Sequence, residues 1–433
     1  MPNPGMEQLL SHRFTSSMAP DLLAVLSNKD EKPRVRAAAA EAVAAINPYA
    51  EKTLEALKKL LDPARDVVER RAAARGLKRM LAMLPESQPD AQPVGGPGAR
   101  PQGFPPAPPA GQPPIAQPQD SSPLQNTRAD LVTAAGLGLI DKNDATVRLL
   151  CLEAIQQALE RRGQFEISRP LALAVNKQTP AVIALLADAD LKACLAAHQV
   201  LEGIAAARWK MPMSGFVPRA ENRLAEGAKL LAGILEALPA LKRSLANEKE
   251  VRVRLAALYV LETLGHEAAA AVDDLVKVLE DKNGYVRWGA VRVLNNMAPR
   301  QAEKAAPALV GRLTDKNSTV RLAAAQALGR YGWQAKAAVK SLEKAIGDSE
   351  PHVRLAAIHA LAAIGPDAHA AAGAVVQALA DKQQKPEVRS AAAQALRRLG
   401  PLAAEAKIAL AQALEDSDSS IRQAASETLL EKD

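Results

Sequence analysis

Apolar residues recur every three or four positions through most of the chain, which predicts amphipathic α-helices. In one clear example, Val320, Ala324 and Leu328 fall on one side of a helix that ends at Gly332. An Asp or Asn turn precedes this helix, and a shorter apolar stripe precedes the turn. The pattern therefore predicts a hairpin of two antiparallel helices, which we call helix A and helix B.

This hairpin is repeated six times between residues 247 and 433. Each copy carries Val-Arg or Ile-Arg near the start of helix B, in steps of 33, 34, 33, 35 and 33 residues. A hairpin of this size has one small apolar face, which it can bury only against neighbouring hairpins. The period predicts an all-α fold, an α-solenoid (superhelix) of stacked hairpins. The anchors are Val253-Arg254, Val286-Arg287, Val320-Arg321, Val353-Arg354, Val388-Arg389 and Ile421-Arg422.

The same period continues upstream, less regularly. Residues 16–84 are predicted to hold two hairpins, because Val68 lies 33 residues after Val35. Val68 is followed by Glu69 rather than Arg, so the second hairpin departs from the pattern. Residues 124–237 are predicted to hold degenerate repeats with an insertion at 208–219, and residues 238–433 the regular array. We expect about nine hairpins in two blocks.

The segment between residues 85 and 123 differs in composition from the rest of the chain. It is rich in Pro, Gly and Gln and has almost no large apolar side chains, so burial cannot offset the entropy of ordering it. We predict a disordered, Pro-rich linker that tethers the two blocks. A proline-recognising domain could also dock on it, but such motifs are common by chance in Pro-rich segments.

Composition supports a soluble helical protein. Hydrophobic residues reach 48% and aromatic residues only 3%, because alanine supplies much of the apolar content. The net charge is +7, but 55 basic residues are mixed with 48 acidic ones, which is typical of a solvated surface rather than of a nucleic-acid footprint. Cys151 and Cys194 lie in apolar helical patterns and are interpreted as free core thiols.

The N-terminus has no secretory signal, and no stretch of about 18 uninterrupted apolar residues predicts a membrane span. We therefore expect a cytoplasmic protein without a membrane span, although a segment upstream of Met1 could be missing.

The repeated residues resemble HEAT repeats, and their short, alanine-rich form is similar to the bacterial HEAT-like repeats typified by phycobilin lyases. The resemblance fails in the linker and around residues 208–237. In that family the turn Asp and the helix-B Arg form ladders between adjacent repeats, which agrees with the strength of charge-assisted, bidentate hydrogen bonds. The alternative is an anion-binding spine of regularly spaced arginines. The resemblance implies pairing of Arg254, Arg287, Arg321, Arg354, Arg389 and Arg422 with Asp281, Asp315, Asp348, Asp381 and Asp416.

No catalytic, metal or cofactor motif is found. A HEAT-repeat di-iron hydroxylase of deoxyhypusine binds metal through several His-Glu pairs, and here only His266-Glu267 exists. There is no phosphate-binding glycine loop, no Gly-x-Ser-x-Gly and no His-Glu-x-x-His motif. We therefore expect a protein that is not an enzyme and needs no cofactor.

Helix B lines the concave side of the solenoid in the resembling family. Its exposed positions vary from repeat to repeat and include Trp, Tyr and Arg, which dominate binding energies. The alternative is that the larger of these side chains pack between neighbouring B helices. The insertion is a second candidate, because binding residues often lie on irregular loops, although it could instead cover a defective repeat. The candidate partner-binding residues are Tyr259, Trp288, Arg292, Gln326, His359, Gln394, Arg397, Trp209 and Phe216.

A basic stripe on one helix before the linker, Arg71, Arg75, Lys78 and Arg79, could meet an acidic partner or nucleic acid, or simply be solvated. Our leading hypothesis is a non-enzymatic scaffold or adaptor that binds protein along its concave face. The alternatives are a nucleic-acid-binding protein, disfavoured because residues 241–433 hold 27 basic and 23 acidic residues, and a bilin lyase-like or chromophore chaperone protein. Fold alone supports the last of these. The repeats leave the partner's identity and the oligomeric state open.

Overall fold

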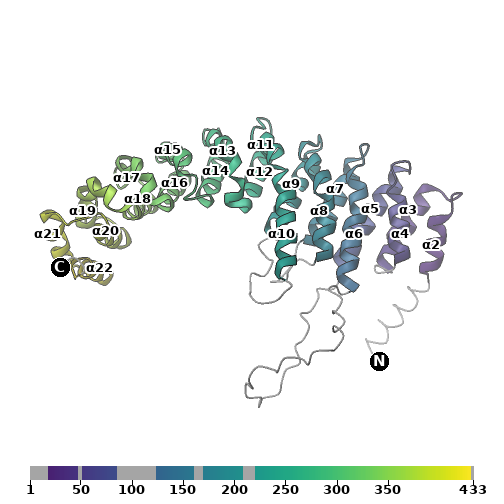
Figure 1. Ribbon diagram of the computed structural model, residues 1–433, viewed down its shortest axis with the longest axis horizontal. Helices are drawn as coiled ribbons and strands as arrows, with labels where there is room; N and C mark the ends of the chain where they lie inside the picture. Colours follow the sequence, from purple (N-terminus) through teal and green to yellow (C-terminus); the bar gives the residue numbers. More distant parts are fainter. Residues whose placement is uncertain (1–17, 47–50, 85–122, 160–168, 208–219, 431–433) are drawn as a thin grey trace, which may run out of the picture. The chain divides into compact units, whose positions relative to one another are not determined.

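The computed structural model describes residues 18–46, 51–84, 123–159, 169–207 and 220–430 (Figure 1). Within these ranges every regular element is a helix. Contacts divide the chain into two units, residues 1–234 and residues 235–433. Each unit is a stack of helical hairpins, as the repeat period predicted.

Unit 1 contains four hairpins within its described residues. Helices α3, α5, α7 and α9 form the helix-B layer, in which each helix packs against the next. Helices α2, α4, α6 and α8 form the helix-A layer in the same way. The elements are α2 (Ala19–Ser27), α3 (Pro33–Ile46), α4 (Glu51–Leu60), α5 (Val67–Met83), α6 (Pro123–Leu139), α7 (Ala145–Leu159), α8 (Arg169–Ala184), η1 (Leu185–Ala187), α9 (Leu191–Ala207) and α10 (Ala220–Leu235).

The helices on the two sides of the Pro-rich segment are neighbours in one stack. Helix α5 packs against both α6 and α7, and Arg70 Nε donates to Asp141 Oδ2 at 2.6 Å. We expected this segment to separate two blocks of repeats, but the chain divides after residue 234 instead. The predicted linker at 85–123 lies outside the described residues, except for Pro123. The segment therefore connects two adjacent hairpins of the same unit.

Unit 2 contains six hairpins, one for each Val-Arg or Ile-Arg anchor. Within this unit the B helices lie on the inner side of an arc and the A helices on its outer side (Figure 1). The elements are α11 (Leu238–Leu245), α12 (Val251–Leu264), η3 (Gly265–Ala271), α13 (Val272–Val278), α14 (Gly284–Asn296), α15 (Ala302–Arg312), α16 (Ser318–Tyr331), η4 (Gly332–Ala338), α17 (Val339–Ala345), α18 (Pro351–Ile364), η5 (Gly365–Ala371), α19 (Ala372–Ala380), α20 (Pro386–Arg398), α21 (Ala404–Ala413) and α22 (Ser419–Leu430).

The B helices begin and end at residues suited to helix termini. Asn283 accepts hydrogen bonds from the backbone N–H groups of Tyr285 and Val286, and Asn317 accepts one from Thr319. The glycine after helix B has a positive φ in four repeats, which only glycine adopts readily. The ψ of this glycine is −130° at Gly265 and −137° at Gly332, which lies outside the left-handed helical region. The four φ values are 59° at Gly265, 59° at Gly332, 78° at Gly365 and 114° at Gly400.

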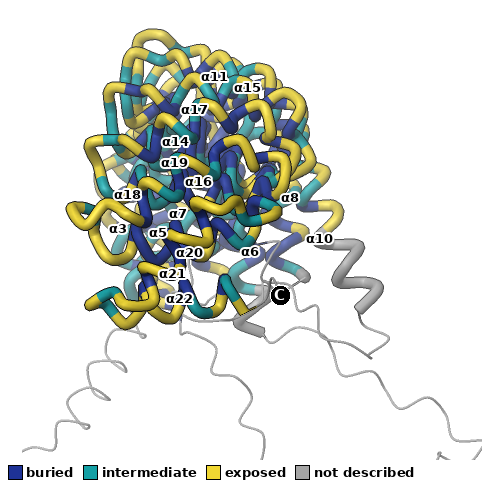
Figure 2. The backbone as a smooth tube through the Cα atoms, turned by 90° about the vertical axis from the view of Figure 1, so that its left-hand side faces the viewer, coloured by how far each residue is buried: buried dark blue, intermediate teal, exposed yellow. Residues whose placement is uncertain are grey.

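The core lies between the two helix layers of each unit, where the buried positions face one another (Figure 2). Small residues bring the B helices close together: a Cβ added to Gly329 would lie 3.2 Å from the Cα of Ala360. Tyr331 is 1% exposed, and its hydroxyl donates to the carbonyl oxygen of Leu294 at 2.8 Å. The core is thus built mainly from alanine and branched aliphatic side chains, and Tyr331 adds a buried polar contact between repeats.

Two segments of the described chain, Pro170–Ala187 and Val251–Val278, are long and apolar enough to cross a membrane by composition alone. The second of them is interrupted at Gly265 and comprises α12, η3 and α13, so it is not one continuous helix. The first comprises α8 and η1, and α8 packs against α6 and α9. Both segments are core elements of the stack.

Candidate interaction surface

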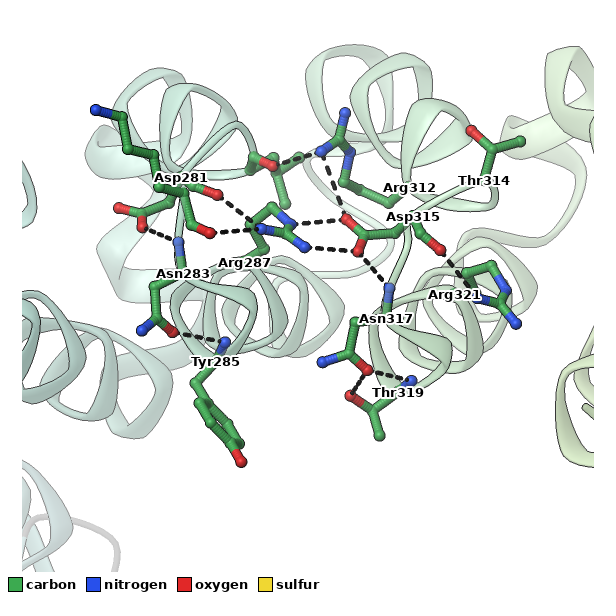
Figure 3. Close-up of polar contacts among 12 residues, drawn as sticks. Asp281, Asn283, Tyr285, Arg287, Arg312, Thr314, Asp315, Asn317, Thr319 and Arg321 are labelled. Atoms are coloured by element: carbon green, nitrogen blue, oxygen red, sulfur yellow. Dashed lines mark hydrogen bonds and ion pairs between the residues drawn. The ribbon is translucent and has the colours of Figure 1, made fainter.

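An arginine on one helix B donates hydrogen bonds to an aspartate in the turn of the next repeat. Arg287 donates from Nε and Nη2 to the two carboxylate oxygens of Asp315, each at 2.7 Å (Figure 3). Its Nη1 donates to the carbonyl oxygen of Asp281 at 2.8 Å, in the turn of its own repeat. Both side chains of the pair are at most 5% exposed. We call such an ion pair between adjacent repeats a rung, and the rungs together form a ladder along the turns.

The same rung is formed at three other junctions of unit 2: Arg254–Asp281 at 2.7 Å, Arg321–Asp348 at 2.7 Å and Arg389–Asp416 at 2.6 Å. The rung expected between Arg354 and Asp381 is not formed. Arg354 donates only to the carbonyl oxygens of Asp348 and Ser349, and within the described chain its buried Nε has no hydrogen-bond partner. Asp381 is exposed.

Arg422 donates to the carbonyl oxygens of Asp416 and Ser417, within its own repeat. No carboxylate of the described residues forms an ion pair with it. Arg422 thus keeps the hydrogen bonds to the turn of its own repeat, as the other anchor arginines do, but it forms no rung within the described residues.

Unit 1 carries a ladder that the sequence analysis missed. Arg36 pairs with Glu69, and Arg148 pairs with Asp188 at 2.6 Å. The rung between Arg70 and Asp141 joins repeats on either side of the Pro-rich segment. The second repeat departs from the Val-Arg pattern because Glu69 follows Val68. Glu69 instead supplies the carboxylate for the preceding repeat, and Arg70 supplies the guanidinium one position later.

The rung between Arg287 and Asp315 holds the carboxyl group of Asp315 in the charged form. Burial is the largest influence on Asp315 and raises its pKa, but it is outweighed by hydrogen bonds from Arg287 and the Asn317 backbone together with the Arg287 charge. The pKa of Asp315 is therefore below its usual range, and a rung of this kind stabilises the fold above the unfolded pKa of about 3.9. That contribution is lost as the pH falls through the lower folded pKa.

The geometry of the arginines argues against an anion-binding spine. In the rungs of unit 2 the arginine side chains are 5% to 14% exposed and already contact carboxylate and carbonyl oxygens. An external anion would have to displace these contacts.

The basic stripe of α5 is largely neutralised. Arg71 pairs with Asp144 at 2.7 Å, Arg75 with Glu41 at 2.6 Å and Lys78 with Glu153 at 2.7 Å. Its acidic partners lie on the neighbouring B helices or their turns, so the stripe joins neighbouring repeats. It is not the free basic patch that nucleic-acid binding would need.

The varied residues of helix B form a second surface of unit 2, which we call the helix-B strip: Tyr259, Trp288, Arg292, Gln326, His359, Gln394 and Arg397. At one end, the Arg292 guanidinium lies over the ring of Trp288, 4.6 Å from its centroid, and pairs with Glu262 on the preceding helix B. Tyr259 is 46% exposed. Trp288 is half-buried, so it contributes to packing and still presents part of its ring to solvent.

Further along the strip, two grooves lie between B helices. The first, of about 400 Å³, has Gln326 on α16 and His359 on α18 among its lining residues. The second, also of about 400 Å³, lies among α18, α20 and α22 and is lined by His359, Gln394 and Arg397. His359 therefore belongs to both grooves, and four of the candidate residues line one continuous path.

Two candidate residues cannot be placed, and two exposed aromatic residues were not among the candidates. Trp209 and Phe216 lie outside the described residues. Tyr285 and Trp333 were not selected, but they are 70% and 66% exposed. Both lie next to a helix terminus, Tyr285 at the start of α14 and Trp333 in η4. All the strip residues follow the Val anchor of their helix B, whereas Tyr285 precedes Val286 and Trp333 lies beyond the end of α16.

Within the described residues, no group of three or more His, Cys, Asp or Glu side chains could hold a metal ion. Cys151 is fully buried and Cys194 is 5% exposed. Burial raises the pKa of the Cys194 thiol to about 11, so it stays protonated at neutral pH.

Comparison with known proteins agrees with this architecture. A protein-family model described as HEAT repeats matches residues 8–78, 238–329, 272–346, 308–397 and 351–431, which together exceed half of the chain. No curated protein sequence matches significantly. The ladder of α7 and α9 shows that the same repeat geometry continues into part of residues 79–237, where the family model finds no match.

Among solved structures, an engineered protein aligns with 95% of this chain and 98% of its own, at 20% identity and a TM-score of 0.55. This likeness shows the fold alone. A second engineered protein covers 59% of this chain and 95% of its own, at 23% identity and a TM-score of 0.38. A structure of Kap95p binding RanGDP covers 96% of this chain and 56% of its own, at 15% identity and a TM-score of 0.39.

Proposed function

Since the chain belongs to the HEAT-repeat family, we propose that it is an interaction scaffold whose unit 2 binds a polypeptide segment along the helix-B strip. The observation that carries this proposal is the pair of grooves joined at His359. Each groove could take side chains of an extended segment, and the shared residue makes the path continuous.

The chemistry of the strip supports the same conclusion. Trp, Tyr and Arg are enriched at binding hot spots, and here Trp288, Arg292 and Tyr259 lie at one end of the path. The ladder residues, in contrast, recur at most junctions of the unit and hold it together. Residues that vary between repeats and remain accessible are available for recognition.

The alternative functions have less support. Nucleic-acid binding would need a dense cationic groove, but the basic stripe of α5 is paired with acidic residues. A chromophore-binding role would need a defined enclosed pocket, and both grooves on the strip are open clefts between helices.

Site-specific photo-crosslinking in lysate of the source cells tests the proposal. A benzophenone amino acid is placed at Gln326 on the strip or, as the matched control, at Lys340 on α17; both positions are exposed. We expect a crosslinked protein with the Gln326 probe that the Lys340 probe does not give. The crosslink should be lost when Trp288→Ala and Arg292→Ala are added, while helicity by circular dichroism is kept.

Treatment with nuclease before irradiation separates the alternatives. A crosslink that disappears after nuclease treatment would replace the proposal with nucleic-acid binding. Equal crosslinking from Gln326 and Lys340 would show that the strip has no special role.

A further inference from the structure

We propose that the segment bound by unit 2 is acidic and carries one apolar side chain that is inserted between α16 and α18. This inference rests on the proposed function and names the chemistry of its partner. It follows from the lining of the two grooves, in which an apolar floor is combined with a one-sided excess of cationic groups.

The first groove has an apolar floor. Leu322 and Leu355 line it from opposite helices, together with alanines of α16 and α18. It exists because Gly329 lets the backbones of α16 and α18 approach, and no long side chain fills the space between them. Leu322 and Leu355 are only half-buried, so a ligand side chain seated on them would remove apolar surface from water.

The rim of this groove is polar. Gln326 and His359 are both exposed and stand on either side of the floor. The groove partly desolvates the imidazole of His359 and lowers its pKa, so the ring is neutral at neutral pH and can donate or accept a hydrogen bond. Such a rim suits the backbone of an extended peptide, which offers both N–H and C=O groups.

Cationic groups surround the two grooves. Arg330 lines the first, and Arg397 and Arg398 line the second. Arg330 and Arg398 are exposed and form no ion pair within the described residues, unlike Arg292 at the other end of the strip, which is neutralised by Glu262. Glu427 is the single carboxylate among the lining residues of both grooves. The local charge is therefore complementary to an acidic ligand.

The same lining disfavours a nucleic acid. Single-stranded nucleic acids are held by aromatic side chains on which bases stack, together with a cationic groove along the phosphates. Neither groove is lined by a Phe, Tyr or Trp residue, and the first has Arg330 as its only arginine or lysine. An apolar anchor flanked by carboxylates fits these grooves better than a chain of phosphates.

Selection from a random peptide library displayed on phage, with the full chain as bait, tests the inference. We expect enrichment of peptides in which Asp and Glu flank a Leu, Ile or Phe. Changing both Arg330 and Arg398 to alanine should weaken the selected peptides about tenfold, since two exposed ion pairs together contribute about 1.4 kcal/mol. The matched control changes Lys340 and Lys344 on α17 to alanine and should leave the affinity unchanged.

Replacing the apolar residue of a selected peptide by Ala should also weaken binding, and raising the salt concentration should weaken the acidic peptides most. Selection of neutral or basic peptides that still crosslink to the probe at Gln326 would overturn this inference and leave the scaffold proposal intact. Failure to select any peptide that crosslinks there would remove both. If a single-stranded oligonucleotide binds more tightly than the selected peptides at the same salt concentration, the inference of an acidic peptide ligand is overturned in favour of nucleic acid.

Discussion

Two neighbouring junctions of unit 2 carry the same ladder residues, yet only one forms the rung. Between α16 and α18, Arg321 donates to both oxygens of Asp348, at 2.7 and 2.8 Å. Between α18 and α20, Arg354 and Asp381 do not pair, and the Arg354 Nε is buried without a partner. The difference lies in the turn: Val353 follows Asp348 by five positions, whereas Val388 follows Asp381 by seven.

The comparison teaches that a rung depends on the length of the turn as much as on its residues. With two extra residues, the turn places Asp381 in solvent, away from the preceding helix B. The Pro-rich segment shows the converse, because it lies between two hairpins, outside any helix A to helix B turn, and the rung between Arg70 and Asp141 is formed across it. A long insertion between two hairpins is thus compatible with a closed rung, whereas the rung is open at Asp381, where the turn within a hairpin has two extra residues.

The largest expected effect comes from breaking a closed rung. Arg287→Ala would leave the buried Asp315 carboxylate without its partner, and removing one member of a buried pair costs about 3–5 kcal/mol. Arg354→Ala removes only hydrogen bonds to backbone carbonyls, worth about 1 kcal/mol. Urea unfolding of the full chain, followed by hydrogen exchange of α14 to α16, measures the difference.

Hydrogen exchange is needed because repeat stacks can unfold in parts, so one global midpoint would mix the two units. Equal losses from the two substitutions would mean that the rung contributes little beyond the contacts of the arginine with its own turn.

A smaller effect is expected from closing the open junction. Deleting Gln383 and Gln384 restores the five-position spacing, and the turn then resembles the one that begins at Asp348. Asp381 could then accept from the unpartnered Arg354 Nε, which should stabilise this junction by about 1–2 kcal/mol. Slower hydrogen exchange at the start of α20 would report it.

The matched control combines the deletion with Asp381→Ala, which shortens the turn without supplying the carboxylate. A gain that survives in this control would come from loop shortening alone.

The repeat period was enough to predict the hairpins because it reflects how each unit buries its apolar face. Val320 and Leu328 recur at helical spacing, and both are fully buried. Turn chemistry was also predictable in kind, since Asn317 caps α16 and glycine follows it. About nine hairpins were expected, and the described residues form ten. Helices α8 and α9, which were expected to form a degenerate repeat, pack as an ordinary pair.

The open rung, the role of Glu69 and the grooves of the strip depend on distances between residues of different helices, and the spacing of residues along the sequence does not give these distances. The resemblance to HEAT repeats implied that Arg354 and Asp381 pair, but they do not pair across the longer turn. Glu69 was taken as a defect because the pattern required Arg at that position. The strip residues were chosen by their positions along helix B. The first groove, in contrast, exists because Gly329 and the alanines of α16 and α18 leave its floor without long side chains.

The smallest effect is expected where the comparison predicts tolerance. Shortening residues 85–122 by half should change the stability of unit 1 by only about 0.6 kcal/mol, because the entropy of closing a loop depends weakly on its length. The rung between Arg70 and Asp141 should persist, so Asp141→Ala should destabilise the shortened and the full-length proteins equally. A double-mutant cycle measured by urea unfolding checks this. A strong coupling between loop length and Asp141 would mean that this junction, like the one at Asp381, is sensitive to the connection that precedes it.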